Sequence, residues 1–210
     1  MTSQPIPGRS GIVAGHCGAF YDGIADLIDP ERLTNYARNQ CQLEALGIYS
    51  VLAWGRQAKR AQNAVETLLI ECPPAATPYG QVRAAIGAGT LRLCVEATRI
   101  GDYAKRRRAL EKLVAMDVRT AGVDELSSAV GLKSARLIVL HSRPNQAVAA
   151  LDRHVLAYLR GRGHDVPEQD TPRSPKRYAH LERLFLAECE QQGRDPAELD
   201  LATWLDRRRA

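Results

Sequence analysis

The stretch GVDELSSAVGLKSARLIVLHSRPNQAVAALDRHVLAYLR, residues 122–160, decides the fold. Apolar residues recur in it at three- and four-residue steps, which predicts helices rather than strands. Gly131 interrupts the pattern and permits a tight turn, so we expect one helix over residues 123–129 and another over residues 132–141. Asp152 precedes a further periodic segment and can cap it with its side chain. The stretch therefore predicts a helical hairpin followed by a capped helix.

Helical signals extend over the rest of the chain. Four times, a side chain that can accept from an unpaired helix N–H precedes a proline, at Asp29-Pro30, Thr77-Pro78, Ser174-Pro175 and Asp195-Pro196. Periodic apolar faces are predicted from residue 30 to a stop at Gly47, over residues 58–72, after a cap at Asp102, and over residues 178–189 and 199–205. No stretch alternates apolar and polar residues as a half-buried strand does. We therefore predict an all-α fold.

Charge and cysteine usage limit the class of protein. The 210 residues carry a net charge of +5, and residues 101–210 hold twenty Lys and Arg against sixteen Asp and Glu. This surplus suits a polyanionic partner, although the run at residues 105–108 is also typical of a solvated helix face. No apolar run approaches the roughly 18 residues of a membrane span, so we expect a cytoplasmic protein. The five scattered cysteines predict buried free thiols and no metal site.

Lys133 and Asp152 are the residues of the quoted stretch that can carry chemistry. Lys133 begins the second hairpin helix, where the helix dipole disfavours a protonated amine, and a neutral lysine is a nucleophile. Most lysines at helix starts are simply solvated, so Asp152 is the more telling residue. Its capping role is structural, yet a carboxylate held in this way can also accept a proton from a neighbouring amine.

These residues also resemble a known family. Val130-Gly131-Leu132-Lys133, followed by Leu151-Asp152-Arg153-His154 with the Asp nineteen residues after the Lys, resembles the motif of the helix-hairpin-helix (HhH-GPD) DNA glycosylases, in particular the 8-oxoguanine DNA glycosylase/AP lyases. The resemblance is clear over residues 120–160. Ala129 stands where the family hairpin usually has its first glycine. The segment at residues 199–204 resembles the C-terminal helix that closes the base pocket in the compact branch of the family.

The resemblance implies an HhH-GPD glycosylase fold, in which residues 1–210 form one unit of two helical lobes with an active-site cleft between them. We expect residues 1–50 and 161–210 to form a terminal lobe. Residues 51–160 would form the core lobe, which carries the hairpin at residues 122–142. The family resemblance implies no cofactor and a monomer acting on double-stranded DNA that contains a damaged base.

The resemblance further implies a role for each site residue. Lys133 would attack C1′ of a nucleotide rotated out of the duplex and leave a Schiff base that permits strand cleavage, with Asp152 as its proton partner. We expect contacts to DNA from the hairpin and from the start of the following helix: Val130, Gly131, Ser134, Arg136, Arg153 and His154. Asp200 and Trp204 are candidates for the base pocket, although a core position for Trp204 and a structural role for His154 have the better odds from sequence alone.

Two other functions fit the same residues. The first is an N-glycosidase of this fold that acts on another modified base, a nucleotide or RNA, for example in defence against phage. The second is a helix-hairpin-helix module that binds DNA without catalysis. The oxidised purine is therefore one substrate among several that the sequence permits. The enzyme requires Lys133 for its activity, whereas the DNA-binding module does not.

Overall fold

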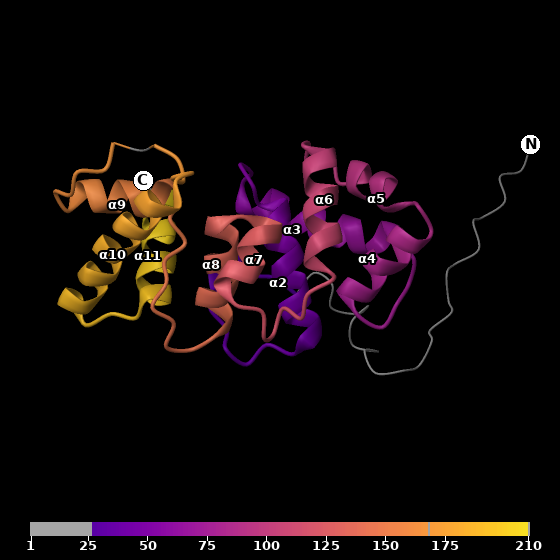
Figure 1. The fold of residues 1–210 in the computed structure, drawn as a ribbon, viewed down its shortest axis with the longest axis horizontal. Helices are drawn as coiled ribbons and strands as arrows, with labels where there is room; N and C mark the ends of the chain where they lie inside the picture. The colour runs from indigo at the N-terminus through magenta and orange to yellow at the C-terminus, as the bar shows by residue number, and fades with distance from the viewer. Residues whose placement is uncertain (1–26, 168, 210) are drawn as a thin grey trace, which may run out of the picture.

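The computed structural model describes residues 27–167 and 169–209, and within them it contains helices and no strand (Figure 1). The all-α class predicted from the sequence is therefore confirmed for this part of the chain. The elements in chain order are the 3-10 turn η2 (Pro30–Arg32) and the helices α2 (Gln40–Leu52), α3 (Ala58–Glu71), α4 (Pro78–Gly87), α5 (Leu91–Ala97), α6 (Tyr103–Leu113), α7 (Val123–Val130), α8 (Leu132–Ser142), α9 (Arg153–Gly161), α10 (Pro175–Gln192) and α11 (Pro196–Arg209).

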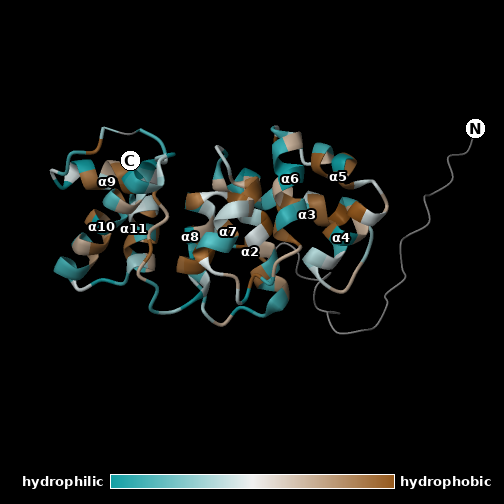
Figure 2. Ribbon diagram, in the orientation of Figure 1, coloured by the Kyte–Doolittle hydropathy of each residue, from teal (hydrophilic) through white to brown (hydrophobic). Residues whose placement is uncertain are grey.

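The helices form two lobes that lie side by side (Figure 1). The N-terminal lobe, residues 27–142, buries one apolar core from Ile28 to Val139 around the almost wholly buried helix α2. The C-terminal lobe, residues 149–206, has its own core built from α9, α10 and α11. Helices of both lobes carry brown apolar stretches beside teal polar ones in Figure 2, as expected of amphipathic helices that pack on one face.

The lobes meet where α8 faces α10 and α11. Leu132 of α8 packs against the core of the C-terminal lobe, and Leu201 of α11 packs against the core of the N-terminal lobe. Leu140, Ala150 and Ala197 form a small buried cluster between the two cores. One side of α8 therefore serves as the boundary between the lobes, and any group on it is placed next to both.

This division differs from the one expected from the sequence. Residues 28–52 pack into the N-terminal lobe with α3, α4, α6 and α8, rather than with residues 161–210. Likewise, α9 packs with α10 and α11 and leaves the lobe that holds the rest of residues 51–160. The reason is that α2 is apolar around its circumference, so it requires helices on all sides, which α3, α4, α6 and α8 provide.

The helix predicted from Pro30 to Gly47 is wrong at both ends. Asp29 caps only the short turn η2, and α2 begins after Asn39, whose side chain and that of Gln42 form a reciprocal capping box. The helix then runs through Gly47 to Leu52. Gly47 therefore lies within the helix and does not end it. Its lack of a side chain serves packing, because a Cβ there would collide with the Tyr79 hydroxyl.

Other predicted boundaries are confirmed. Thr77, Ser174 and Asp195 each accept a hydrogen bond from a backbone N–H in the first turn of the helix that follows. The helix predicted over residues 58–72 is α3, and Pro73 follows its C-cap. Gly193 closes α10 with φ +60°, a left-handed conformation that glycine adopts without strain. The short helix α5 was not predicted.

Helix α6 corrects two expectations. Asp102 stands at the N-cap position but has φ +51° and makes no capping bond with its side chain. Arg106, expected on a solvated face with its neighbours at residues 105–108, is fully buried. Its guanidinium donates to the carbonyls of Val51, Trp54 and Gly101, so it closes the C-terminal end of α2. One arginine of the charge run therefore has a structural role, as a donor to backbone carbonyls.

Two further expectations concern sulfur and membranes. The four cysteines within the described residues, Cys41, Cys72, Cys94 and Cys189, are free and buried, as predicted, whereas Cys17 lies outside these residues. The described part of the chain contains no group of side chains suited to a metal ion. None of its helices combines the length and apolar character that crossing a membrane requires.

Candidate active site

The predicted hairpin is present and turns on one residue. α7 and α8 are joined by Gly131 alone, which has φ +84° and ψ +167°, a conformation that favours glycine. The first backbone bond of α8 runs from Ala135 N to Gly131 O at 3.1 Å. The N–H groups of residues 132–134 therefore have no acceptor within the helix, and they point out of its N-terminal end beside the exposed Gly131.

Lys133 and Asp152 converge, as the sequence argument required. Asp152 caps α9: its Oδ1 accepts from His154 N at 2.8 Å and from Val155 N at 3.0 Å. The second oxygen, Oδ2, lies 3.7 Å from Lys133 Nζ. The two side chains are 33% and 23% exposed, so a reactant can reach them. The carboxylate thus holds α9 with one oxygen and presents the other to the amine.

Asp200 of α11 lies at the boundary of the lobes, where its Oδ2 is 3.1 Å from His141 Nε2. Burial raises the pKa of Asp200 and the Asp152 carboxylate raises it further, whereas the hydrogen bond and charge of His141 and the charge of Lys133 oppose the rise. Asp200 is thus within electrostatic range of both Lys133 and Asp152. Trp204, one turn further along α11, is half-buried and has at least one interaction partner. The two candidates for a base pocket therefore lie one turn apart on the same helix.

The side chains of two predicted phosphate contacts, Ser134 and Arg136, point inward and have partners within the protein. Ser134 is buried, where it accepts from Trp54 Nε1 at 2.8 Å and donates to Ser50 O at 3.1 Å. Arg136 donates to Glu182 Oε1 at 2.7 Å, and its guanidinium lies 4.5 Å from the centre of the Tyr178 ring. Ser134 therefore joins α8 to α2, and Arg136 joins the two lobes.

The remaining predicted DNA contacts divide between core and surface. Val130 is buried, so it can offer DNA only its backbone, next to the exposed Gly131. Arg153 is exposed, and its Nε lies 3.2 Å from Nε2 of the half-buried His154. These two side chains line an open depression of about 410 Å³ directly after Asp152, together with Ala157, Arg160, Gln169 and Asp170. A basic surface thus adjoins the candidate catalytic carboxylate.

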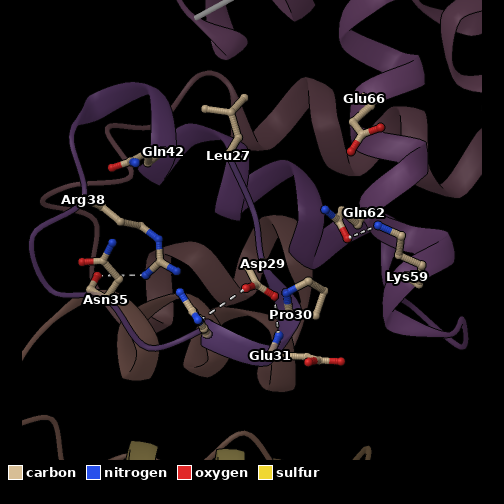
Figure 3. A pocket seen from close by; sticks show the side chains of 11 residues that line it. Leu27, Asp29, Pro30, Glu31, Asn35, Arg38, Gln42, Lys59, Gln62 and Glu66 are labelled. Atoms are coloured by element: carbon tan, nitrogen blue, oxygen red, sulfur yellow. Dashed lines mark hydrogen bonds and ion pairs between the residues drawn. The ribbon is translucent and has the colours of Figure 1, made fainter. Parts of the chain in front are cut away.

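A larger depression, about 900 Å³, lies elsewhere on the N-terminal lobe (Figure 3). Residues of η2, α2 and α3 and of the segment between η2 and α2 line it, and neither Lys133 nor Asp152 does. Several of its side chains bind one another, for example Lys59 with Gln62 in Figure 3. Because this depression is lined by both acidic and basic residues and lies away from Lys133 and Asp152, we assign it no role in their chemistry.

Sequence reasoning missed His141 and Thr34. His141 of α8 is fully buried between the lobes and hydrogen-bonds Thr34 with one ring nitrogen and Asp200 with the other. These partners are 107 and 59 residues away in sequence, so no local pattern could have joined them. The one available signal was a histidine within an apolar helical face, which is more often a structural residue than a functional one.

Comparisons with known proteins do not assign the chain. No protein-family model matches it, and no solved structure matches it either. The functional argument therefore rests on the arrangement of Lys133, Asp152 and their surroundings.

Proposed function

We propose that the protein is a DNA N-glycosylase with AP lyase activity, which removes an oxidised purine such as 8-oxoguanine from duplex DNA. The observation that carries the proposal is the separation of 3.7 Å between Lys133 Nζ and Asp152 Oδ2 at the boundary of the lobes. An amine and a carboxylate at this distance can exchange a proton through one water molecule, or directly once a small side-chain movement brings them within hydrogen-bond distance. The specific HhH-GPD fold and the monomeric state belong to the same proposal.

The reaction would begin with Lys133. Its neutral amine attacks C1′, the bond from C1′ to the base breaks, and the electron pair leaves with the base. The surplus proton of the attacking amine passes to Asp152, from which the departing base can take it. Opening of the sugar at C1′ gives a Schiff base, and loss of a C2′ proton then expels the 3′ phosphate. While ionised, Asp152 also stabilises positive charge that develops at C1′.

Three features support duplex DNA as the partner. The unpaired N–H groups at residues 132–134 lie at the positive end of α8, where a phosphate oxygen is well bound. Arg153 and Arg160 of α9 line the depression whose residues begin directly after Asp152 in the chain. The half-buried Trp204, one helical turn after Asp200 on α11, is an aromatic side chain of the kind on which an extruded base stacks. Phosphate contacts of this kind set the register of the duplex, while the base pocket selects the lesion.

Borohydride trapping tests the proposal. The protein is incubated with duplexes that carry 8-oxoguanine or other lesions, and a Schiff base is reduced to a stable covalent adduct. We expect an adduct with the wild type and none with Lys133→Gln. Lys112→Gln, which changes an exposed lysine at the end of α6, is the matched control and should trap normally.

Asp152→Asn separates catalysis from capping. Asparagine caps a helix about as well as aspartate, so α9 should fold, whereas proton transfer to the carboxylate is lost. We expect adduct formation to slow by about a hundredfold or more, the size of a general acid–base contribution. If no lesion in the panel yields an adduct while the duplex still binds, the protein is a DNA-binding module. An adduct with a different base or with RNA would reassign the substrate.

A further inference from the structure

A chain of hydrogen bonds crosses the molecule behind the candidate active site. Thr34 Oγ1 lies 2.8 Å from His141 Nδ1, and His141 Nε2 lies 3.1 Å from Asp200 Oδ2. Thr34 belongs to the segment before α2, His141 to the last turn of α8, and Asp200 to α11. The chain therefore links both lobes, and it ends at the Asp200 carboxylate, whose pKa is influenced by the charges of Lys133 and Asp152.

His141 is fixed from every side. Its side chain is fully buried, and both ring nitrogens have partners. Its backbone carbonyl accepts from Asn35 N at 3.0 Å and from an Arg38 guanidinium nitrogen at 2.6 Å. Arg38 in turn donates to the carbonyls of Leu33 and Asn35, so the segment at residues 33–38 wraps around the end of α8. A buried imidazole with all these contacts has one available orientation.

Maintaining such a buried polar chain needs an explanation, since apolar residues could fill the same space without any desolvation cost. Asp200 is 14% exposed, so its carboxylate is largely but not fully shielded from water. His141 occupies one of its oxygens and thereby sets the direction of the other. A partly shielded carboxylate within electrostatic range of an amine and a second carboxylate influences the charge of both.

We propose that His141 is a positioning residue: together with Thr34 it fixes the orientation of the Asp200 carboxylate at the boundary of the lobes, and through the charge of Asp200 it acts on the Lys133–Asp152 pair. The inference rests on the proposed glycosylase function. The charged and titratable groups within electrostatic range of Asp200 are His141 and Lys133 of α8, Asp152 at the start of α9, and Tyr178 and Cys189 of α10. Within the described residues, the direct hydrogen bond among these contacts is the one with His141, so His141 determines the orientation of Asp200.

The kinetic test uses single-turnover excision by purified variants. His141→Leu removes the donor to Asp200, and we expect the rate to fall between about tenfold and a hundredfold, as for a catalytic group that is misplaced. Affinity for the duplex should stay within about threefold of wild type, because phosphate contacts are unchanged. His141→Gln keeps an N–H donor and should recover most of the rate. Equal rates for wild type and a folded His141→Leu would overturn the proposal.

A second measurement does not depend on activity. The Asp200 carboxyl is titrated by carbon-13 NMR, with Asp200→Asn for assignment, in the wild type and in His141→Leu, or in His141→Gln if the leucine variant fails to fold. Because His141 lowers the pKa of Asp200, its removal should move the titration to higher pH. An unchanged curve rejects the positioning role even if excision by the variant is slowed. A shifted curve in a protein that traps no lesion rejects the glycosylase and leaves the coupling of the two side chains intact.

Discussion

Replacing Arg136 with methionine tests whether this arginine joins the lobes or binds DNA. In the structure, Arg136 Nε lies 2.7 Å from Glu182 Oε1, and the two side chains are only 14% and 12% exposed. Glu182 Oε1 also accepts from Ala149 N at 2.9 Å. Methionine fills most of the space of the arginine stem but leaves the Glu182 carboxylate without its partner. The variant therefore measures the loss of the charged guanidinium, with the packing of the side-chain stem largely kept.

The expected loss follows from the cost of an unpaired buried charge. Removing one partner of a buried ion pair typically costs about 3–5 kcal/mol. Glu182 keeps the Ala149 N–H and slight access to water, so the lower end of this range applies, about 3 kcal/mol. For a chain of this length, each kcal/mol shifts the Tm by about 2–4 °C, which gives a fall of about 6–12 °C. The double variant Arg136→Met/Glu182→Gln removes the charge and keeps the acceptor, and it should recover at least about half of the loss.

Urea denaturation measures the free energy of unfolding, and the salt dependence of duplex binding measures the phosphate contacts. We expect Arg136→Met to lose stability and to keep the wild-type salt dependence. The reasoning is refuted if the variant is as stable as the wild type while the slope of log K against log salt falls by about 0.9, the contribution of one phosphate contact. Arg136 would then bind DNA, as its position on the hairpin first indicated.

Two further predictions concern buried polar groups. The Tyr178 hydroxyl accepts from Leu151 N and donates to Ala149 O, so Tyr178→Phe should lower the free energy of unfolding, measured by urea denaturation, by about 2 kcal/mol. The Tyr79 hydroxyl has no hydrogen-bond partner among the described residues, so Tyr79→Phe should leave this free energy unchanged or raise it by up to about 1 kcal/mol. Asp200 has a raised pKa, so the folded state holds its proton more tightly than the unfolded state, and stability falls as the pH rises from the ordinary value of 3.8 towards the folded pKa. The free energy of unfolding of the wild type relative to Asp200→Asn should therefore decrease over that interval, and parallel curves would contradict the assigned direction.

Features set by neighbouring residues could be predicted from the sequence. The turn at Gly131, the cap at Asp152 and the starts of α4 and α10 depend on contacts within about one helical turn, and they are found where the pattern placed them. The start of α2 was missed, although Asn39 and Gln42 carry its signal, because the proline after Asp29 gave a stronger one that leads only to a 3-10 turn.

Features set by distant partners could not be predicted in this way. Ser134 and Arg136 lie on the hairpin helix, where a polar residue faces either DNA or another helix. Their partners Trp54 and Glu182 are 80 and 46 residues away, and nothing near either residue distinguishes the two cases. Arg106 is buried for the same reason, since the carbonyls it closes belong to the end of α2 and to the turn before α6.

Helix α8 explains why the candidate site lies where it does. Its first turn holds Lys133, its middle holds Arg136 and its last turn holds His141, and each of them pairs with an acidic residue of the C-terminal lobe: Asp152, Glu182 and Asp200. The Arg136–Glu182 and His141–Asp200 pairs are largely shielded from water and fix the distance and rotation between the lobes. The Lys133–Asp152 pair is the most exposed of the three, so it alone can be opened by a reactant without separating the lobes. A lobe boundary held by one shielded ion pair and one buried hydrogen bond thus positions a third, accessible pair, which is the arrangement that a nucleophilic amine and its proton acceptor require.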